Sequence, residues 1–272
     1  MSGSGAEYLL GDDGAEVARL ERQHRAWVGP MYALLEDVGL SAGMRVLDLG
    51  CGPGFTAFEL AHFVGVSGTV VACDNNAGFL NVLERERDRR RLRQVATLKA
   101  GVESLPVDQG SFDVIYGRWI LSWLADVEGV LERAGALLRP GGALVLQEYL
   151  DWGASKLLPR SEAFDAGIRA CMENWDQAGG SINVAQTVVG LARKVGLSLD
   201  SFQVQARSGR PGDLVWQWLG EFYHSFWPTL VERGHLTEGE MTAFLASFRA
   251  AGRNPGSVIL APVMADIVLR RP

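Results

Sequence analysis

"VLDLGCGPGFTAFEL", residues 46–60, is the stretch that decides the fold of this chain. An apolar run ends in Asp48, Gly50, Gly52 and Gly54 follow at alternate positions, and a helical pattern then begins. Glycine lets the backbone adopt dihedrals that are forbidden to other residues and approach a ligand closely. The first strand–turn–helix of a parallel sheet also points backbone N–H groups and a positive helix end at the carboxyl edge of the sheet. The stretch therefore predicts a cradle for a small ligand.

Short apolar runs alternate with helical patterns from about Gly43 to Tyr149. Such alternation implies right-handed crossovers and a parallel sheet that is covered by helices on both faces. The expected strands read MRVLDL, TVVACD, ATLKA, FDVIYG and ALVLQEY, and the expected helices lie at about 54–66, 75–94 and 124–138. A helix in VVGLARKVGL and strands in SFQVQAR and VMADIVLR are expected to complete the sheet.

Segments outside this alternation are expected to be helical. Residues 13–38 repeat apolar side chains at helical spacing, and Pro30 is expected to split them into two helices. Two long inserts later in the chain are expected to fold over the sheet as a helical cap. The expected domains are an N-terminal helical lid at 1–40, a core at 41–150, and a remainder at 151–272 that holds the last strands and inserts at about 151–182 and 209–256.

The composition describes an acidic globular protein. Apolar residues make up 47% and charged residues 21%, and the charges sum to 26 − 32 = −6. This balance argues against a surface for nucleic acid, and no apolar run reaches the length of a membrane span. The N-terminus shows no signal peptide, and the three cysteines lack metal-type spacing. We therefore expect a cytoplasmic protein with reduced thiols, no metal, no nucleic-acid partner and no membrane partner; a homodimer is left open.

The glycine pattern excludes two common phosphate loops. The dinucleotide fingerprint G-x-G-x-x-G would need glycine at Phe55, and a Walker loop would need a Gly-Lys-Ser/Thr ending. The stretch instead resembles the D-x-G-x-G-x-G loop of class I S-adenosylmethionine-dependent methyltransferases. Segments at the expected distances extend the resemblance over about 41–150: Asp74 at the end of the second strand, AGVESLP (100–106), FDVIYGRWILSWLAD (112–126) and LLRPGGALVLQE (137–148).

This resemblance implies a fold and a cofactor. The fold is a doubly wound, Rossmann-like, mostly parallel seven-stranded sheet with the last strand antiparallel, and the cofactor is S-adenosylmethionine. Gly50 and Gly52 would face its methionine end, Asp48 would help to hold its amino group, and Asp74 would bind the ribose. The other implied cofactor positions are Tyr8 in the lid, Cys51 in the loop, Asn75 beside the adenine, Val102 and Glu103 in the adenine loop, and Gly117, Arg118 and Trp119 after the fourth strand.

Three positions in these segments carry qualifications. Many relatives have an aspartate where this chain has Gly101, so one contact with the adenine amino group is missing. Arg118 could bind the cofactor carboxylate or an acidic side chain at the surface. A cysteine nucleophile is not expected at Cys51, because no histidine lies nearby in the sequence.

Aromatic residues are dense in the inserts, and they predict the acceptor site. An apolar, ring-lined cavity suits a planar or lipophilic small molecule, although the same rings could form the core of a cap. His224, among the aromatic residues of FYHSFW, is a candidate general base, and Glu148 at the end of the fifth strand is another. Both could instead be structural. The candidate acceptor contacts are Tyr149, Trp152, Trp175 and Tyr223.

The sequence thus predicts a methyltransferase that acts on O or N of a small, aromatic or lipophilic metabolite, as in secondary metabolism. The Asn/Asp-Pro-Pro-aromatic motif of nucleic-acid amino methylases is replaced by YGRW at 116–119. The cysteine nucleophile of pyrimidine C5 methylases is absent near the fourth strand. Two alternatives stay open: an enzyme that uses the cofactor for a cyclisation or rearrangement without methyl transfer, and an inactive cofactor-binding regulator.

Overall fold

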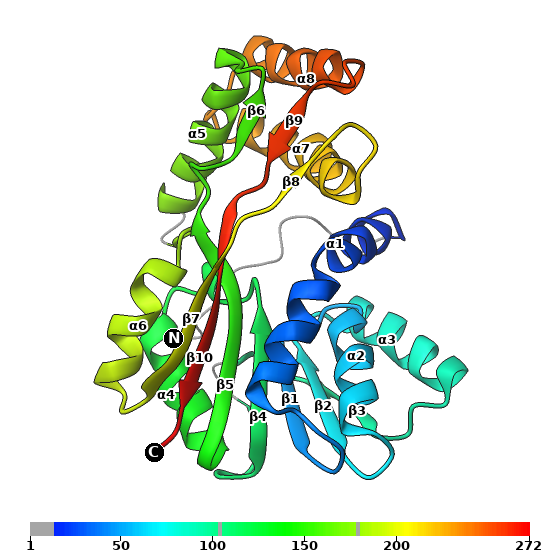
Figure 1. Ribbon diagram of the computed structural model, residues 1–272, viewed down its shortest axis with the longest axis vertical. Helices are drawn as coiled ribbons and strands as arrows, with labels where there is room; N and C mark the ends of the chain where they lie inside the picture. Colours follow the sequence, from blue (N-terminus) through cyan, green and yellow to red (C-terminus); the bar gives the residue numbers. More distant parts are fainter. Residues whose placement is uncertain (1–13, 103–104, 178–179) are drawn as a thin grey trace.

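A computed structural model describes residues 14–102, 105–177 and 180–272 of the chain. Its main sheet has the strand order β3-β2-β1-β4-β5-β10-β7 (Figure 1). Strands β1 to β5 pair in parallel, whereas β10 is antiparallel to both β5 and β7. The predicted seven-stranded sheet with an antiparallel last strand is therefore confirmed. The strands are β1 (Arg45–Leu49), β2 (Thr69–Asp74), β3 (Val95–Lys99), β4 (Phe112–Arg118), β5 (Leu138–Asp151), β7 (Ser198–Gln205) and β10 (Val263–Arg270).

Helices cover both faces of this sheet, because its strands are apolar on both sides. Val46 and Leu47 are neighbours on β1, yet they enter the hydrophobic cores on opposite faces. Helices α4 and α6 pack on one face, and α2, α3 and the second half of α1 pack on the other. The helices are α1 (Gly14–Val38), α2 (Phe55–Val64), α3 (Ala77–Arg90), α4 (Val127–Leu137) and α6 (Ala185–Lys194).

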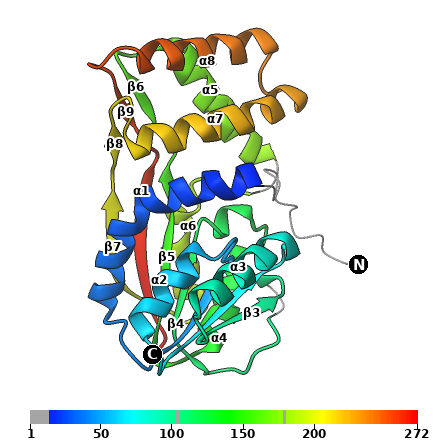
Figure 2. The same ribbon diagram turned by 90° about the vertical axis from the view of Figure 1, so that its right-hand side faces the viewer.

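The N-terminal helix needs one correction. Pro30 was expected to separate two helices, but α1 runs through it from Gly14 to Val38. A proline inside a helix removes one backbone hydrogen bond and commonly bends the axis without ending the helix. The ribbon of α1 changes direction along its length, and its first part lies between α7 and the helices α2 and α3 (Figure 2). Whether α1 closes over a ligand as a lid stays a prediction.

The two inserts form a cap beyond one end of the sheet (Figure 1). Besides helices, they contain a small antiparallel sheet in the order β6-β9-β8, which the sequence analysis missed. Its strands are two or three residues long, which is too short for an alternating pattern to be recognised. The cap elements are β6 (Lys156–Leu158), α5 (Glu162–Gln177), β8 (Ser208–Gly209), α7 (Leu214–Glu232), α8 (Glu238–Gly252) and β9 (Val258–Leu260).

Aromatic side chains fill the core of the cap. Tyr223 and Phe244 are fully buried there, with ring centroids 5.0 Å apart. Trp27 of α1 joins the same core and meets the ring of Trp218 edge-on at 6.0 Å. The first part of α1 therefore packs against the cap, while its second part packs against the sheet. A pocket lies between the cap and the sheet.

Candidate active site

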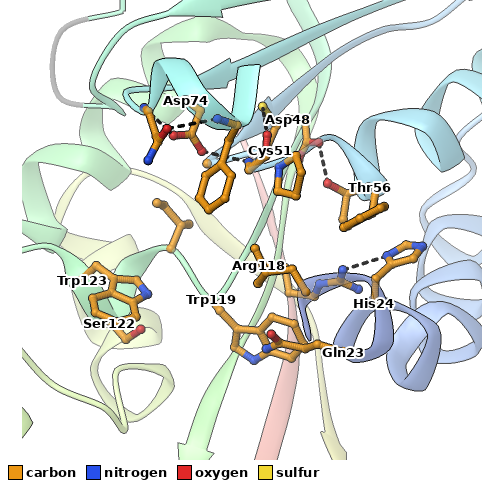
Figure 3. Close-up of a pocket in the computed structure, with 18 of the residues that line it drawn as sticks. Gln23, His24, Asp48, Cys51, Thr56, Asp74, Arg118, Trp119, Ser122 and Trp123 are labelled. Carbon is orange, nitrogen blue, oxygen red and sulfur yellow. Dashed lines mark hydrogen bonds between the residues drawn. The ribbon is translucent and has the colours of Figure 1, made fainter. Parts of the chain in front are cut away.

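A pocket lies where α1, the cap and the carboxyl ends of the parallel strands meet. Figure 3 shows Asp74, Cys51 and Asp48 on one side of it and Trp119 and Trp123 on the other. We call the two sides the cradle half and the aromatic half. The cradle half comprises Asp48, Gly50, Cys51, Gly52, Asp74, Asn75, Val102 and Arg118, and the aromatic half comprises Gln23, Trp119, Ser122, Trp123, Tyr149, Trp152, Trp175, Ile182, Trp218 and Phe222.

The three glycines after β1 all have positive φ, but for different reasons. A Cβ on Gly50 would lie 2.6 Å from a side-chain atom of Ile120, and one on Gly54 would lie 2.5 Å from Leu83. These two glycines let neighbouring elements pack closely. A Cβ on Gly52, with φ +53°, would meet no described atom within 4 Å. Gly52 is therefore the position where the turn leaves open space for a ligand beside bare backbone.

Two carboxylates flank this turn. Asp74, at the end of β2, accepts the N–H of Gly52 at 2.9 Å and that of Asn76 at 2.8 Å, one on each oxygen. Asp48, at the end of β1, is 1% exposed and accepts the hydroxyl of Thr56 at 2.6 Å. Burial raises the pKa of Asp48 to about 7, although the bond from Thr56 opposes the shift. An acid in this position would gain from a cationic ligand that restores its charged form.

Arg118 lies at the junction of the two halves (Figure 3). Its Nη2 lies 3.0 Å from Nδ1 of His24, and its guanidinium carbon lies 4.8 Å from the centre of the Trp119 ring. Its Nη1 is buried and makes no hydrogen bond to any residue that the structure describes. Burial and the charge of Arg118 lower the pKa of His24, although a hydrogen bond with Glu59 opposes the shift. An unpaired, buried donor on a residue that lines the pocket makes Arg118 a candidate partner for an anionic group.

Trp119 follows Arg118 with a φ of +54°, which is rare for a bulky residue and therefore points to a functional constraint. Its backbone N–H donates to the carbonyl of Gln147 at 3.1 Å. Its indole stacks on Tyr149 at 5.8 Å and on Trp218 at 6.0 Å, with small angles between the ring planes. Contacts from β5 and from the cap helix α7 thus hold this ring as a fixed wall of the aromatic half.

Glu148 holds the loop after β4 from behind. Its Oε1 accepts the N–H groups of Ile120 and Leu121, each at 2.9 Å, and its side chain is fully buried. Burial raises the pKa of this carboxyl to about 8, and the two backbone donors lower it. The loop includes the 3-10 turn η2 (Leu121–Trp123), which carries Trp123 into the aromatic half. Glu148 does not line the pocket, so its observed role is to fix the loop that does.

Most of the predicted cofactor residues line this pocket, and so do three of the four predicted acceptor contacts. Gly117 does not line it, because the side chain of Ile120 covers the strand there. Tyr8 and Glu103 lie outside the described residues. Burial raises the pKa of Cys51 well above its usual value, which fits a spacer and not a nucleophile.

Two cap predictions need correction. His224 is exposed on α7, and its Nδ1 lies 2.6 Å from the carbonyl of Gly220, to which it donates. It does not line the pocket, so the structure argues against it as a general base. Tyr223 is fully buried among the rings of the cap core, with Trp227 only 4.7 Å away between centroids. Tyr223 therefore belongs to the cap core. Its neighbour Phe222 lines the pocket instead, because adjacent residues of a helix point in different directions.

Several lining residues were missed by the sequence analysis. Arg19, Gln23 and His24 come from α1, and Trp218 and Phe222 come from α7. The α1 residues are polar but almost completely buried, at 5–6% exposure. A polar stripe at positions i, i+4 and i+5 beside the apolar stripe was the available signal. Trp218 and Phe222 are one helical turn apart, so the sequence predicts that they share a face of the helix. The sequence does not show that this face meets a pocket.

Neither a metal centre nor a membrane span is apparent in the described part of the chain. The described residues contain no group of three histidine, cysteine or acidic side chains that could hold a metal ion. None of the helices formed by those residues combines the length and apolarity needed to cross a membrane.

Comparison with known sequences relates part of the chain to methyltransferases. Residues 46–142 match the sequence model of a family described as a methyltransferase domain. The chain is 35% identical over 127 residues to the ubiquinone/menaquinone biosynthesis C-methyltransferase UbiE of Shewanella sp. (strain ANA-3). That match covers 46% of this chain and 49% of the relative, so the chain spans about half the length of the curated relatives that it matches.

Solved structures share the fold over a larger part of the chain. A protein of Bacillus halodurans described as a methyltransferase aligns with a TM-score of 0.61 at 16% identity, over 89% of this chain and 98% of its own. Geranyl diphosphate C-methyltransferase from Streptomyces coelicolor, solved with S-adenosyl-L-homocysteine, aligns with a TM-score of 0.55 at 15% identity, over 92% and 77%. At these identities the likeness shows the fold alone.

The cradle half fits S-adenosylmethionine on its own geometry. The space beside Gly52 admits a ligand against bare backbone, and the free Nη1 of Arg118 offers a donor for its carboxylate. Asp74 is held by backbone N–H groups of the two turns, and a carboxylate has about four acceptor positions, so capacity remains for a ribose hydroxyl. Asp48 offers a buried carboxylate for the ammonium group. Each charged end of the ligand thus has a partner of opposite charge in the pocket.

Proposed function

We propose that this chain, whose residues 46–142 match a methyltransferase domain, transfers the methyl group of S-adenosylmethionine to a small, planar, apolar acceptor bound in the aromatic half. The observation that carries the proposal is that the cofactor cradle and a wall of aromatic rings share one pocket. A flat apolar molecule gains most from such a wall, because rings bury large areas and prefer stacked or edge-on contacts.

The bound cofactor supplies a methyl group on a positively charged sulfur, which is the difficult part of the chemistry. The chain has to place the acceptor in line with that methyl group and keep water away. Trp119 lies where the cradle half meets the aromatic half and is held by its two stacked neighbours. We propose that its indole forms the floor against which the acceptor lies.

The side chains of the aromatic half support a particular kind of acceptor atom. Its described members include no histidine and no carboxylate, and its polar side chains are Gln23, Ser122, Tyr149 and the tryptophans, of which Trp119 already donates its N–H to the sulfur of Met264. An aliphatic hydroxyl needs a base that removes its proton as it attacks, whereas a neutral amine or an electron-rich ring carbon attacks with an available electron pair and can release its proton to water afterwards. We therefore favour nitrogen or ring carbon over hydroxyl oxygen. The ring-carbon option has separate support, because the UbiE relatives are C-methyltransferases.

A product assay tests this proposal directly. The protein would be incubated with S-adenosylmethionine and a panel of aromatic amines, phenols and quinols, with aliphatic alcohols of similar size as the contrasting set. We expect release of S-adenosylhomocysteine and a methylated product with members of the aromatic set only. Nuclear magnetic resonance of that product would place the methyl group on nitrogen or on carbon. Cofactor binding without transfer to any aromatic compound would contradict the proposal and favour a non-methylating role.

A matched pair of variants links the assay to the pocket. Trp175 lines the aromatic half and contacts the ring of Trp123 at 5.2 Å, whereas Tyr223 lies in the cap core outside it. We expect Trp175→Leu to lower kcat/KM for the acceptor about tenfold or more while leaving cofactor affinity unchanged, because the lost ring contacts are worth about 0.5–1.5 kcal/mol beyond area burial. Tyr223→Phe should change neither quantity. Equal effects of both variants would mean that general cap packing, and not the wall, controls turnover.

A further inference from the structure

A chain of polar contacts leads from α2 through α1 to Arg118. The hydroxyl of Tyr32 donates to Glu59, and the other oxygen of Glu59 lies 3.4 Å from Nε2 of His24. Nδ1 of His24 lies 3.0 Å from Nη2 of Arg118. Because a guanidinium can only donate, one tautomer suits both neighbours. Nε2 carries the hydrogen toward Glu59, and Nδ1 turns its lone pair toward Arg118.

Packing fixes both members of the last contact. The imidazole of His24 is 6% exposed and stacks on Phe55, with ring centroids 5.9 Å apart. The guanidinium of Arg118 lies over the ring of Trp119. Holding a long arginine side chain in one rotamer costs conformational entropy, which is smaller at binding if the side chain is already fixed. With Nη2 turned to His24, the buried Nη1 keeps no hydrogen-bond partner among the described residues.

We propose that His24 is a positioning residue that holds Arg118 so that its Nη1 is directed at the carboxylate of S-adenosylmethionine. The inference rests on the proposed function, because it presupposes that this cofactor occupies the cradle half. His24 acts through Arg118 and is not needed as a base. Helix α1 would thus prepare the cofactor site from outside the glycine turn, and this role would explain a neutral, buried histidine where an apolar residue would pack as well.

The contact depends on the protonation state of His24. Three charged groups face its ring: Glu59 from α2, Arg118 from β4 and Glu21 from α1 itself. A protonated His24 would lose the lone pair on Nδ1 and repel the guanidinium. Because the pKa of His24 lies below its usual value of 6.5, affinity for the cofactor should be complete at neutral pH and fall as the pH drops below 6.5. Replacing the Glu59 carboxylate by an amide should move that fall to lower pH.

Isothermal calorimetry with two ligands separates this role from general packing. S-adenosylmethionine and its decarboxylated form differ by the carboxylate alone, so only the first should sense Arg118. We expect His24→Phe, which keeps a stacking ring but has no acceptor, to weaken S-adenosylmethionine about tenfold, the scale of one hydrogen bond to a charged group. Affinity for the decarboxylated form should stay the same. His224→Asn, which changes an exposed histidine of α7 outside the pocket, is the matched control and should affect neither ligand.

A double-variant comparison tests whether His24 acts through Arg118. Arg118→Leu should itself weaken S-adenosylmethionine, and adding His24→Phe to it should cause no further loss. Glu59→Gln should shift the pH at which affinity for S-adenosylmethionine declines. A purely structural role of His24 would not produce that shift. Circular dichroism on each variant checks that the fold is retained, and His24→Gln, which keeps an acceptor oxygen, should restore part of the affinity if the phenylalanine variant folds poorly.

The outcomes distinguish this inference from the proposed function. Wild-type protein that binds neither ligand would overturn the proposed function, and the inference with it. Wild-type binding together with unchanged affinity in His24→Phe would overturn the inference alone. An equal loss for both ligands, or additive losses in the double variant, would also overturn it, because His24 would then support the pocket in general. A loss confined to the ligand that has a carboxylate would support it.

Discussion

The cradle half and the aromatic half of the pocket differ in how their walls are made. The cradle half comes largely from two segments close in sequence, the turn after β1 and the end of β2, and backbone groups such as the N–H of Gly52 fix it. The aromatic half draws on α1, the loop after β4, the end of β5 and two cap helices, and its members meet through ring contacts. Local backbone geometry therefore defines one half, and long-range side-chain packing defines the other.

We expect this difference to separate cofactor binding, in the cradle half, from acceptor specificity, in the aromatic half. A cofactor shared by many enzymes can be held by backbone groups and a few charges, which tolerate change elsewhere in the chain. An acceptor is recognised by the shape of a cavity, and that shape depends on how α7 and α5 pack over the sheet. Substitutions in the cradle half should therefore abolish cofactor binding with the fold intact, whereas those in the cap should alter acceptor choice or stability first.

The largest effect is expected at Gly52. Gly52→Leu would fill the open space beside the turn and would also force a side chain onto a φ of +53°. We expect affinity for S-adenosylmethionine to fall on the order of a hundredfold or more, equivalent to about 2.7 kcal/mol. Gly110→Leu is the matched control, because Gly110 has a φ of +67°, open space around its Cβ position and an exposed site far along the chain.

Both variants carry a similar backbone cost of about 1–2 kcal/mol, so calorimetry and thermal unfolding must be read together. If the two variants lose stability alike and only Gly52→Leu loses cofactor, the cradle half works as described. Retained binding in Gly52→Leu would show that the ligand does not pass beside this turn, and the contrast between the two halves would lose its basis.

A smaller effect, on stability, is expected at Glu148, which supports the loop that carries Trp119 and Trp123. Glu148→Ala would leave the N–H groups of Ile120 and Leu121 without their acceptor, at a cost of about 2–4 kcal/mol. Glu148→Gln keeps an amide oxygen for both and should unfold close to the wild-type temperature in mildly acidic buffer. Thermal unfolding of the three proteins checks these values.

The difference in stability between wild type and Glu148→Gln should depend on pH, because burial raises the pKa of Glu148. The folded protein holds the proton on Glu148 up to about pH 8, whereas the unfolded chain releases it near pH 4.5. The folded state then binds more protons in this interval, so the contribution of Glu148 to stability falls as the pH rises through it. We expect Glu148→Gln to gain stability relative to wild type between pH 5.5 and 8.5. A constant difference over this range would contradict the assignment of a buried, protonated carboxyl.

The same contrast explains what could be predicted from the sequence. Asp48, Gly52 and Asp74 were identified because a strand, a tight turn and the end of the next strand are local patterns, and these patterns carry the family resemblance that implied their roles. β10 was placed at the residues observed because Pro262 marks its start. Arg19, Gln23 and His24 were missed, since a polar stripe on a helix normally faces solvent and only the cap turns it inward.

The cap itself was predicted as helical and aromatic but without its internal arrangement. Tyr223, His224 and Trp227 are neighbours in sequence, yet only packing decides that the first and last fill the core while His224 points outward. A helix dense in aromatic residues has no single apolar stripe, so periodicity does not fix its rotation. This ambiguity is the physical reason why a base was expected at His224 and why Tyr223 was expected in the acceptor site.

The smallest effect on stability and activity is therefore expected at His224. Its substitution tests whether this residue is a base in the acceptor site or an exposed residue of α7. Its ring lies on the exposed side of α7, and its one described hydrogen bond goes to the carbonyl of Gly220 one turn earlier. That carbonyl already belongs to the helix, so removing the imidazole leaves no buried group without a partner. We expect His224→Ala to change stability by no more than about 0.5 kcal/mol, as is usual for surface sites. Cofactor affinity and turnover on any acceptor found in the panel should equal those of wild type. A strong loss of turnover with unchanged cofactor affinity would mean that α7 rotates or moves when the acceptor binds, and the aromatic half would then have to be redrawn with His224 inside it.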